Sequence, residues 1–222
     1  AMSHKVSVSK VASNAYIMTG MKVDGSGNKV PATIDFASDA NPGKNYLMDV
    51  MYSDVQTTDN GDGTYSYTVK DKDGNEKTVA GSDAAITLTL KDSSAANAKE
   101  YAVTLTYDDI IQDKKTLSDL ASAINKSEAN IQAGFDTANG SFSMYNKTSG
   151  EKNIINITVG NGDTATLLNN LHLAAYNAQD NTLGSKLTFN NGATVAAAKG
   201  TNAQATIDGK TYDLESNKIT VA

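Results

Sequence analysis

Polar and apolar residues alternate over most of this chain, and the alternation predicts a protein built mainly from β-strands. Successive side chains of a strand point to opposite faces, so an alternating segment buries one face and exposes the other. The segment His4–Val11 shows this pattern and is expected to have one buried face. The other segments with strand patterns are 64–69, 77–79, 85–90, 101–107, 130–136, 141–146, 153–159, 203–207, 210–214 and 218–221.

Short turn sequences between these segments predict antiparallel hairpins. Asp208-Gly209 joins the strands at 203–207 and 210–214, and Asp-Gly is a strong two-residue hairpin signal. Asn139-Gly140 and Ser149-Gly150 supply the residues with positive φ that tight turns require. Residues 71–75 form the turn of a second hairpin, which joins 64–69 to 77–79, whereas 91–97 is expected to be a solvent-exposed connection.

One or two short helices are expected to pack on these antiparallel sheets. Thr116 and Asp119 have the spacing of a capping box. A second helix is expected to start at Asp163. The apolar positions recur with helical spacing at 117, 120, 121 and 124 in the first helix, and at 167, 168, 171, 174 and 175 in the second. The predicted fold class is therefore mainly β with a minor α component.

Composition excludes several classes of function. Only 20% of the 222 residues are charged, the net charge is −6, and all 19 basic residues are lysines. Without arginine or an excess of positive charge, a nucleic-acid partner is not expected. The absence of cysteine excludes disulfides, thiolate metal sites and cysteine nucleophiles. No apolar run approaches the length that spans a bilayer, so no membrane partner is expected.

Short matches to catalytic patterns are better explained by ordinary structure. Ser7 and Lys10 fit the Ser-x-x-Lys pattern, but that mechanism needs a helix, and a strand would point these side chains to opposite faces. His4 and His172 are the two histidines of the chain. His172 is placed on the leucine-rich helix without a second ligand nearby, so packing or surface exposure is the preferred interpretation.

The acidic clusters are interpreted as turns rather than sites. Residues 59–63 and 71–76 lack the order of ligands that a calcium loop requires. Asp108 and Asp109 stand near a strand end and are expected to point apart into water, not to form a catalytic pair. Residues 24–28 lack the spacing of a phosphate-binding loop. We therefore predict no catalytic, cofactor-binding or metal-binding residues and no enzyme activity.

One stretch of the chain resembles the IN motif of flagellar axial proteins. Ile124-Asn125 supplies the pair that names the motif, and Ser149-Gly150 stands where Thr-Gly is commoner. The segments that carry the resemblance are 116–125, 131–135, 140–144, 148–150 and 153–157. Flagellins and several hook-associated proteins share this motif, so by itself it indicates only the wider group.

Two flanking segments resemble the flagellar filament cap family, also called hook-associated protein 2. Residues 6–12 are similar to its Val-x-Val-x-x-Leu-Ala strand. Residues 201–209 and 216–219 are similar to its Asp-Ala-x-x-x-Ile-Asp-Gly and Ser-x-Ser-Asn signatures, with Asn202 in place of the first Asp. The three pieces occur in the family's order and cover about half of the chain, whereas residues 20–97 match nothing recognisable.

The resemblance implies a non-enzymatic fragment of the cap at the extracellular tip of the flagellar filament. Such a protein would self-associate in its full-length form and promote the polymerisation of flagellin, and its head would be placed to contact host mucin or glycans. Because the coiled-coil legs of the family are missing and Ala1-Met2 resembles a cloning remnant, we expect an excised head fragment.

The resemblance also implies two β-rich lobes. Residues 1–19 and 200–222 would form a small lobe, and 20–199 a larger lobe containing the IN motif at about 101–159. The alternatives are the variable outer domain of a flagellin or another hook-associated axial protein. Heptad-rich legs in the full gene would favour the cap, whereas an enzyme would show a pocket with converging acids.

Overall fold

The computed structural model describes residues 3–23, 25–27 and 29–220. These ranges leave out the N-terminal dipeptide, the two ends of segment 24–28, the ends of the predicted small lobe, and the last residue of the expected strand 218–221. Residues 218–220 are described and do not form a strand.

The chain is mainly β, as predicted, with 46% of its residues in strands and 14% in helices. A five-stranded antiparallel sheet has the order β10-β11-β2-β13-β14. Its strands are β2 (Asn14–Thr19), β10 (Ile131–Asp136), β11 (Ser141–Ser149), β13 (Leu173–Asn177) and β14 (Thr182–Lys186). A four-stranded sheet has the order β15-β12-β8-β9. Its strands are β8 (Ala84–Ser93), β9 (Tyr101–Thr106), β12 (Asn153–Val159) and β15 (Thr194–Lys199).

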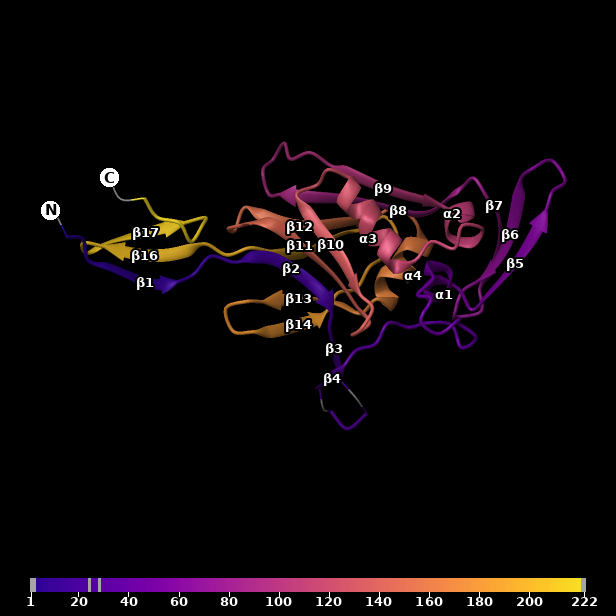
Figure 1. The fold of residues 1–222 in the computed structure, drawn as a ribbon, viewed down its shortest axis with the longest axis horizontal. Helices are drawn as coiled ribbons and strands as arrows, with labels where there is room; N and C mark the ends of the chain where they lie inside the picture. Colours follow the sequence, from indigo (N-terminus) through magenta and orange to yellow (C-terminus); the bar gives the residue numbers. More distant parts are fainter. Residues whose placement is uncertain (1–2, 24, 28, 221–222) are drawn as a thin grey trace.

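Two three-stranded sheets extend the molecule in opposite directions (Figure 1). The terminal sheet contains β1 (Val6–Lys10), β16 (Ala203–Ile207) and β17 (Lys210–Leu214), and both chain ends lie beside it. The distal sheet contains β5 (Asp54–Asp59), β6 (Tyr65–Lys70) and β7 (Glu76–Ala80). A two-stranded ribbon is formed by β3 (Met21–Val23) and β4 (Lys29–Pro31).

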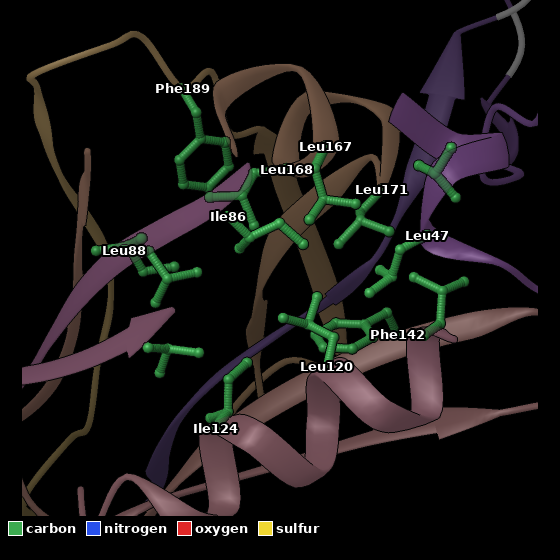
Figure 2. Packing of buried hydrophobic residues seen from close by; sticks show 14 of the residues in the cluster. Leu47, Ile86, Leu88, Leu120, Ile124, Phe142, Leu167, Leu168, Leu171 and Phe189 are labelled. Atoms are coloured by element: carbon green, nitrogen blue, oxygen red, sulfur yellow. The ribbon is translucent and has the colours of Figure 1, made fainter. Parts of the chain in front are cut away.

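One hydrophobic core joins the two larger sheets and the helices. The helices are α1 (Leu47–Met51), α2 (Tyr107–Ile111), α3 (Leu117–Lys126) and α4 (Gly162–Asn170). In Figure 2, Leu120 of α3 points toward Phe142 of β11, and Leu167 and Leu171 reach the same core from above. These four side chains are fully buried or nearly so.

Several strand predictions are confirmed by the pairing. The hairpin of β16 and β17 turns at Asp208-Gly209, where both residues have positive φ. The pairs β6–β7 and β10–β11 form hairpins at the predicted turns. In α3, Thr116 and Asp119 form the predicted capping box, and the four predicted apolar positions are buried. Periodicity and turn chemistry were therefore sufficient for these local elements.

The predicted second helix is longer than the helix in the structure. α4 ends at Asn170, and residues 173–177 form β13 instead. His172 has φ of 52°, which takes the backbone out of the helix, so Ala174 and Ala175 pair with β2. The number of helices was also underestimated, because α1 and α2 have only five residues each. Residues 91–93, expected in a connection, belong to β8.

The expected buried face of β1 was also wrong. All five residues of this strand are exposed, and Val6 and Val8 retain 50% and 56% of their accessible surface. The strand lies at the edge of the terminal sheet, so its alternating pattern does not indicate a buried face.

Strand β2 was assigned to the small lobe by its sequence position. It pairs with β11 and β13 in the five-stranded sheet.

Candidate functional site

Parts of the segments that carry the family resemblance lie where the terminal sheet joins the rest of the molecule. We call this region the junction and define it by Ala12, Ser13, Ser149, Gly150, Gly200, Thr201, Asn202, Glu215 and Asn217. The chain crosses it twice, once between β1 and β2 and once between β15 and β16 (Figure 1). Ser13 and Thr201 form a two-way backbone bridge between the crossing segments.

Asn217 connects the two ends of the chain at the junction. Its Oδ1 accepts a hydrogen bond of 2.6 Å from the Ala12 N–H, and its Nδ2 donates one of 3.1 Å to the Ala12 carbonyl oxygen. Ala12 is 8% exposed. One side chain thus satisfies both polar groups of a buried backbone unit 205 residues away in sequence.

The turn at Ser149-Gly150 contacts the C-terminal segment. Ser149 Oγ donates to the Glu215 carbonyl oxygen at 2.8 Å, and Asn202 Oδ1 accepts from the Glu151 N–H at 2.9 Å. Lys152 and Glu215 form an exposed ion pair at 3.0 Å. The turn at 148–150 and the two residues after it therefore contact Asn202 and Glu215, the residue directly before the resembling segment 216–219.

Glycine is required at two junction positions for space and conformation. A Cβ at Gly200 would lie 2.3 Å from the Gly150 carbonyl oxygen and 2.7 Å from that of Ser13. Gly150 has φ of 105°, a value that other residues rarely adopt. Backbone therefore packs directly against backbone at Gly150 and Gly200.

The Ile124-Asn125 pair has a separate structural role. Ile124 is buried, whereas the Asn125 amide accepts from the Ala133 N–H at 2.7 Å and donates to the Ala133 carbonyl oxygen at 3.0 Å. β10 is an edge strand of its sheet, so Asn125 satisfies backbone groups on its unpaired side. The pair therefore attaches α3 to the sheet through one apolar and one polar side chain.

A second polar cluster lies between three helices and the distal sheet. Asp163 of α4 accepts hydrogen bonds from the Tyr52 hydroxyl at 2.7 Å and the Tyr107 hydroxyl at 2.5 Å, and it pairs with Lys77 Nζ at 2.8 Å. Burial, followed by the nearby Asp163, raises the pKa of the Tyr52 hydroxyl well above its usual value, and the same influences raise the pKa of Tyr107. Both tyrosines therefore act as neutral hydrogen-bond donors.

Three of the residues considered as catalytic candidates lie on or beside β1, and a fourth, His172, follows α4. Ser7 and Lys10 belong to the exposed strand β1. His4 Nδ1 lies 2.7 Å from Asp208 Oδ2, and His172 Nε2 lies 2.9 Å from Asp35 Oδ2. His172 follows the end of α4 rather than lying on it. Within the described ranges, no group of three or more His, Cys, Asp or Glu side chains is arranged to hold a metal ion.

The two acidic turn clusters use their carboxylates to stabilise local backbone. Asp59 Oδ1 accepts from the Gly61 N–H, and Asp71 Oδ1 accepts from the N–H groups of Asp73 and Asn75. Hydrogen bonds from Asn75, Asp73 and Gly74 outweigh the opposing effect of desolvation and lower the pKa of Asp71. The interpretation of these clusters as turns is confirmed.

Asp108 and Asp109 point apart, but not into water as predicted. Asp109 is the capping-box acid of α2, and its Oδ2 accepts from the Thr106 N–H at 2.8 Å. Asp108 Oδ1 accepts from the Tyr67 hydroxyl at 2.5 Å. The spacing of Thr106 and Asp109 was a capping signal that the sequence analysis missed.

Three hollows of the surface differ in the side chains that line them. A hollow of about 390 Å³ beside the junction is lined by Tyr16, Tyr145, Tyr176 and small residues. A smaller one of about 110 Å³ includes Asp71 and Asp163, whose carboxylates already have the partners described above. Another, of about 180 Å³, is lined by three acids, Asp39, Asp49 and Asp54, and Asp49 Oδ2 is buried without a hydrogen-bond partner. Among the described residues, no helix is long and apolar enough to cross a membrane.

Comparisons with known proteins give structural matches only. No protein-family model and no curated protein matches the sequence. A structure of the D1-D2-D3 domains of the flagellar cap protein FliD from Escherichia coli matches with 16% identity and a TM-score of 0.49, covering 99% of this chain but 44% of that one. The D2-D3 domains of FliD from Serratia marcescens match with 18% identity and a TM-score of 0.47, covering 99% of this chain and 80% of that one.

A third solved structure, FliD (HAP2) from Pseudomonas aeruginosa PAO1, matches with 15% identity and a TM-score of 0.45. It covers 98% of this chain and 68% of that one. The chain thus spans less than half the length of the Escherichia coli D1-D2-D3 chain. These structural neighbours are domains of flagellar cap proteins from several bacteria.

Proposed function

We propose that this chain is the head region of a flagellar filament cap protein and has a structural rather than a catalytic role. The observation that carries the proposal is the meeting of three sequence segments that resemble the cap family. They lie far apart in the sequence, yet they come together at the junction. Asn217 binds the Ala12 backbone, whereas Ser149 and Asn202 bind Glu215 and Glu151, which directly adjoin the resembling segments. Chance matches would have no reason to meet at one place.

The proposed protein acts outside the cell, at the filament tip. The full-length protein would self-associate there and promote the addition of flagellin subunits, and contact with host mucin or glycans would follow from the same location. We further propose two lobes, a small one built on the terminal sheet and a larger one containing the IN motif. Sheet membership favours a boundary near Ala12 and Ser13 in place of residue 19.

The location can be tested by immunogold labelling of intact flagella with antibodies raised against this chain. We expect gold particles only at the distal ends of filaments. Labelling along the whole filament would overturn the proposal in favour of the alternative, an outer domain of a flagellin. Labelling only at the filament base would instead indicate another hook-associated protein.

A genetic experiment tests the assembly role separately. Deleting the gene that encodes this chain should leave cells with short or absent filaments and with unpolymerised flagellin in the medium. Supplying the full-length protein should restore filament growth. Normal filaments after the deletion would contradict a cap function, and loss of flagellin itself from the medium would again favour the flagellin alternative.

A further inference from the structure

Four Asn-Gly pairs occur in the described part of the chain, at Asn60, Asn139, Asn161 and Asn191. Asn-Gly is the sequence in which an asparagine side chain is most open to attack by the following backbone nitrogen, because glycine has no Cβ to hinder the approach. The reaction needs a backbone N–H that is free to lose its proton and an amide group that is free to rotate toward it. In the folded chain, the four pairs differ in the hydrogen bonding of the glycine N–H and in that of the asparagine side chain.

Three of the pairs are protected by hydrogen bonds. At Asn60, the Gly61 N–H is bound to Asp59 Oδ1 at 2.9 Å, and the side-chain amide donates to Thr64 and Ser66. At Asn191, the Gly192 N–H is bound to the Val159 carbonyl oxygen at 3.0 Å. Either restraint hinders the attack.

Asn161 is protected by its side chain. It caps the N-terminus of α4, and its Oδ1 accepts from both the N–H and the hydroxyl of Thr164, at 2.8 and 2.7 Å. Its Nδ2 donates to the carbonyl oxygens of Ala84 and Ala85. Rotation of this amide toward Gly162 would break all four bonds.

Asn139 is held much less firmly. The Gly140 N–H has no hydrogen-bond acceptor among the residues that the structure describes. Gly140 is partly exposed, has φ of 61°, and follows the exposed residues 137–139 in the turn between β10 and β11. The side-chain amide makes one bond, from Nδ2 to Asp136 Oδ2 at 2.6 Å, on an exposed surface. A single solvent-exposed bond opens readily, because water replaces the lost partner.

We propose that Asn139 is a site of spontaneous deamidation and reacts before the other Asn-Gly pairs. The Gly140 nitrogen forms a bond to Cγ of Asn139, the bond from Cγ to Nδ2 breaks, and ammonia leaves with the proton lost by the Gly140 nitrogen. Water then opens the resulting succinimide at either carbonyl, giving aspartate or isoaspartate. The only co-reactant is water, and no group is oxidised or reduced.

The product changes the hairpin at its tip. A carboxylate replaces an amide that donated to Asp136, so two negative charges face each other where a hydrogen bond stood. The isoaspartate form also lengthens the backbone of the turn by one carbon. Both effects weaken the end of the β10–β11 hairpin and add one negative charge to the chain.

Peptide mapping by mass spectrometry tests the order of reaction. The folded chain is incubated at mildly alkaline pH, and conversion at the four asparagines is followed by the mass gain that accompanies replacement of NH₂ by OH. We expect Asn139 to convert severalfold faster than the other three. In a parallel sample unfolded by denaturant, the four sites should react at similar rates, because the protecting hydrogen bonds are absent.

The proposal would be overturned if Asn60, Asn161 or Asn191 converted as fast as Asn139 or faster in the folded chain. It would also be overturned if Asn139 stayed intact in the folded chain while it reacted in the unfolded sample. Asn139→Gln serves as a matched control, because its longer side chain would have to close a less favourable six-membered ring. This variant keeps an amide opposite Asp136, and it should lose the first acidic species seen by isoelectric focusing. Persistence of that species would assign it to another residue and refute the site.

Discussion

Asp163 shows how one buried carboxylate connects elements that are distant in sequence. It accepts hydrogen bonds from Tyr52, at the end of α1, and from Tyr107, at the start of α2. Asp163→Ala would leave both largely buried hydroxyls without an acceptor, and we expect the free energy of unfolding to fall by about 2–4 kcal/mol. Chemical denaturation monitored by circular dichroism would measure the change.

Lys77 provides the matched control for Asp163. Its side chain is 50% exposed, so removing it costs an ion pair that water already screens. Lys77→Ala should therefore lower the free energy of unfolding by less than about 1 kcal/mol. Equal losses for the two variants would show that the ion pair, and not the tyrosine hydroxyls, accounts for the role of Asp163.

Asp49 should make the protein less stable as the pH rises. Burial is the main cause that raises the pKa of its carboxyl group above the ordinary value of 3.8, and one of its oxygens has no hydrogen-bond partner. The folded state therefore keeps the proton to a higher pH than the unfolded state does. The resulting penalty is absent below the unfolded pKa and is complete above the folded pKa.

Asp49→Asn removes this penalty, because the amide does not ionise. At neutral pH, we expect the variant to be as stable as the parent chain or more stable, and the gap should close as the pH falls toward 3.8. Thermal melts of both proteins across this range provide the measurement. A variant that is less stable at neutral pH, with a gap independent of pH, would contradict this assignment.

At the scale of elements, Asn125 determines how α3 is attached to β10. Asn125→Ala leaves the N–H and carbonyl groups of Ala133 without their side-chain partner. We expect a loss of about 2–3 kcal/mol in the free energy of unfolding, because two polar groups of a largely buried backbone unit become unsatisfied. Hydrogen exchange at Ala133 should accelerate as well.

Asn125→Asp gives a closer comparison, since the carboxylate keeps the acceptor for the Ala133 N–H but loses the donor. It also places a negative charge beside the Ala133 carbonyl oxygen. We expect a loss of stability that remains when the pH is neutral and diminishes in acid, where the protonated carboxyl group can donate. Unchanged exchange at Ala133 in both variants would show that packing of Ile124 alone holds the helix.

The elements that the sequence predicted are those specified by local chemistry. The capping box at Thr116 and the turns at Gly140 and Gly209 depend on neighbours within a few residues. By contrast, β2 was missed although Ala15 and Ile17 are buried at alternate positions, and the second helix was extended because Ala174 and Ala175 fit its period. This segment is a strand because it pairs with β2, and the local sequence pattern does not indicate that pairing.

At the scale of the whole molecule, the junction was the least predictable feature. The family resemblance implied one lobe made of residues 1–19 and 200–222, and within these ranges β1 pairs with β16. The resemblance gave no indication that Asn217 would bind the Ala12 backbone or that Gly200 would pack against the Gly150 carbonyl oxygen. Such contacts depend on long-range geometry, which a single sequence does not display.

Asn217 should therefore control the attachment of the terminal sheet without affecting the core. Asn217→Ala leaves the Ala12 N–H and carbonyl oxygen without that partner, while Ser13 and Thr201 keep their backbone bridge. We expect local opening at the junction to become easier by about 1–3 kcal/mol, seen as faster hydrogen exchange around residues 11–14 and 200–203. The exchange of α3 and α4 should stay unchanged, because these helices pack in the core away from the junction.

Small-angle X-ray scattering adds a readout of shape to the same experiment. A loosened junction lets the terminal sheet take several orientations, so the distance distribution of Asn217→Ala should broaden at its long end. Ser7→Ala, an exposed change on the same sheet, should leave both scattering and exchange as they are. If Asn217→Ala behaved like Ser7→Ala, the close backbone packing at Gly150 and Gly200 would be sufficient to hold the two parts together.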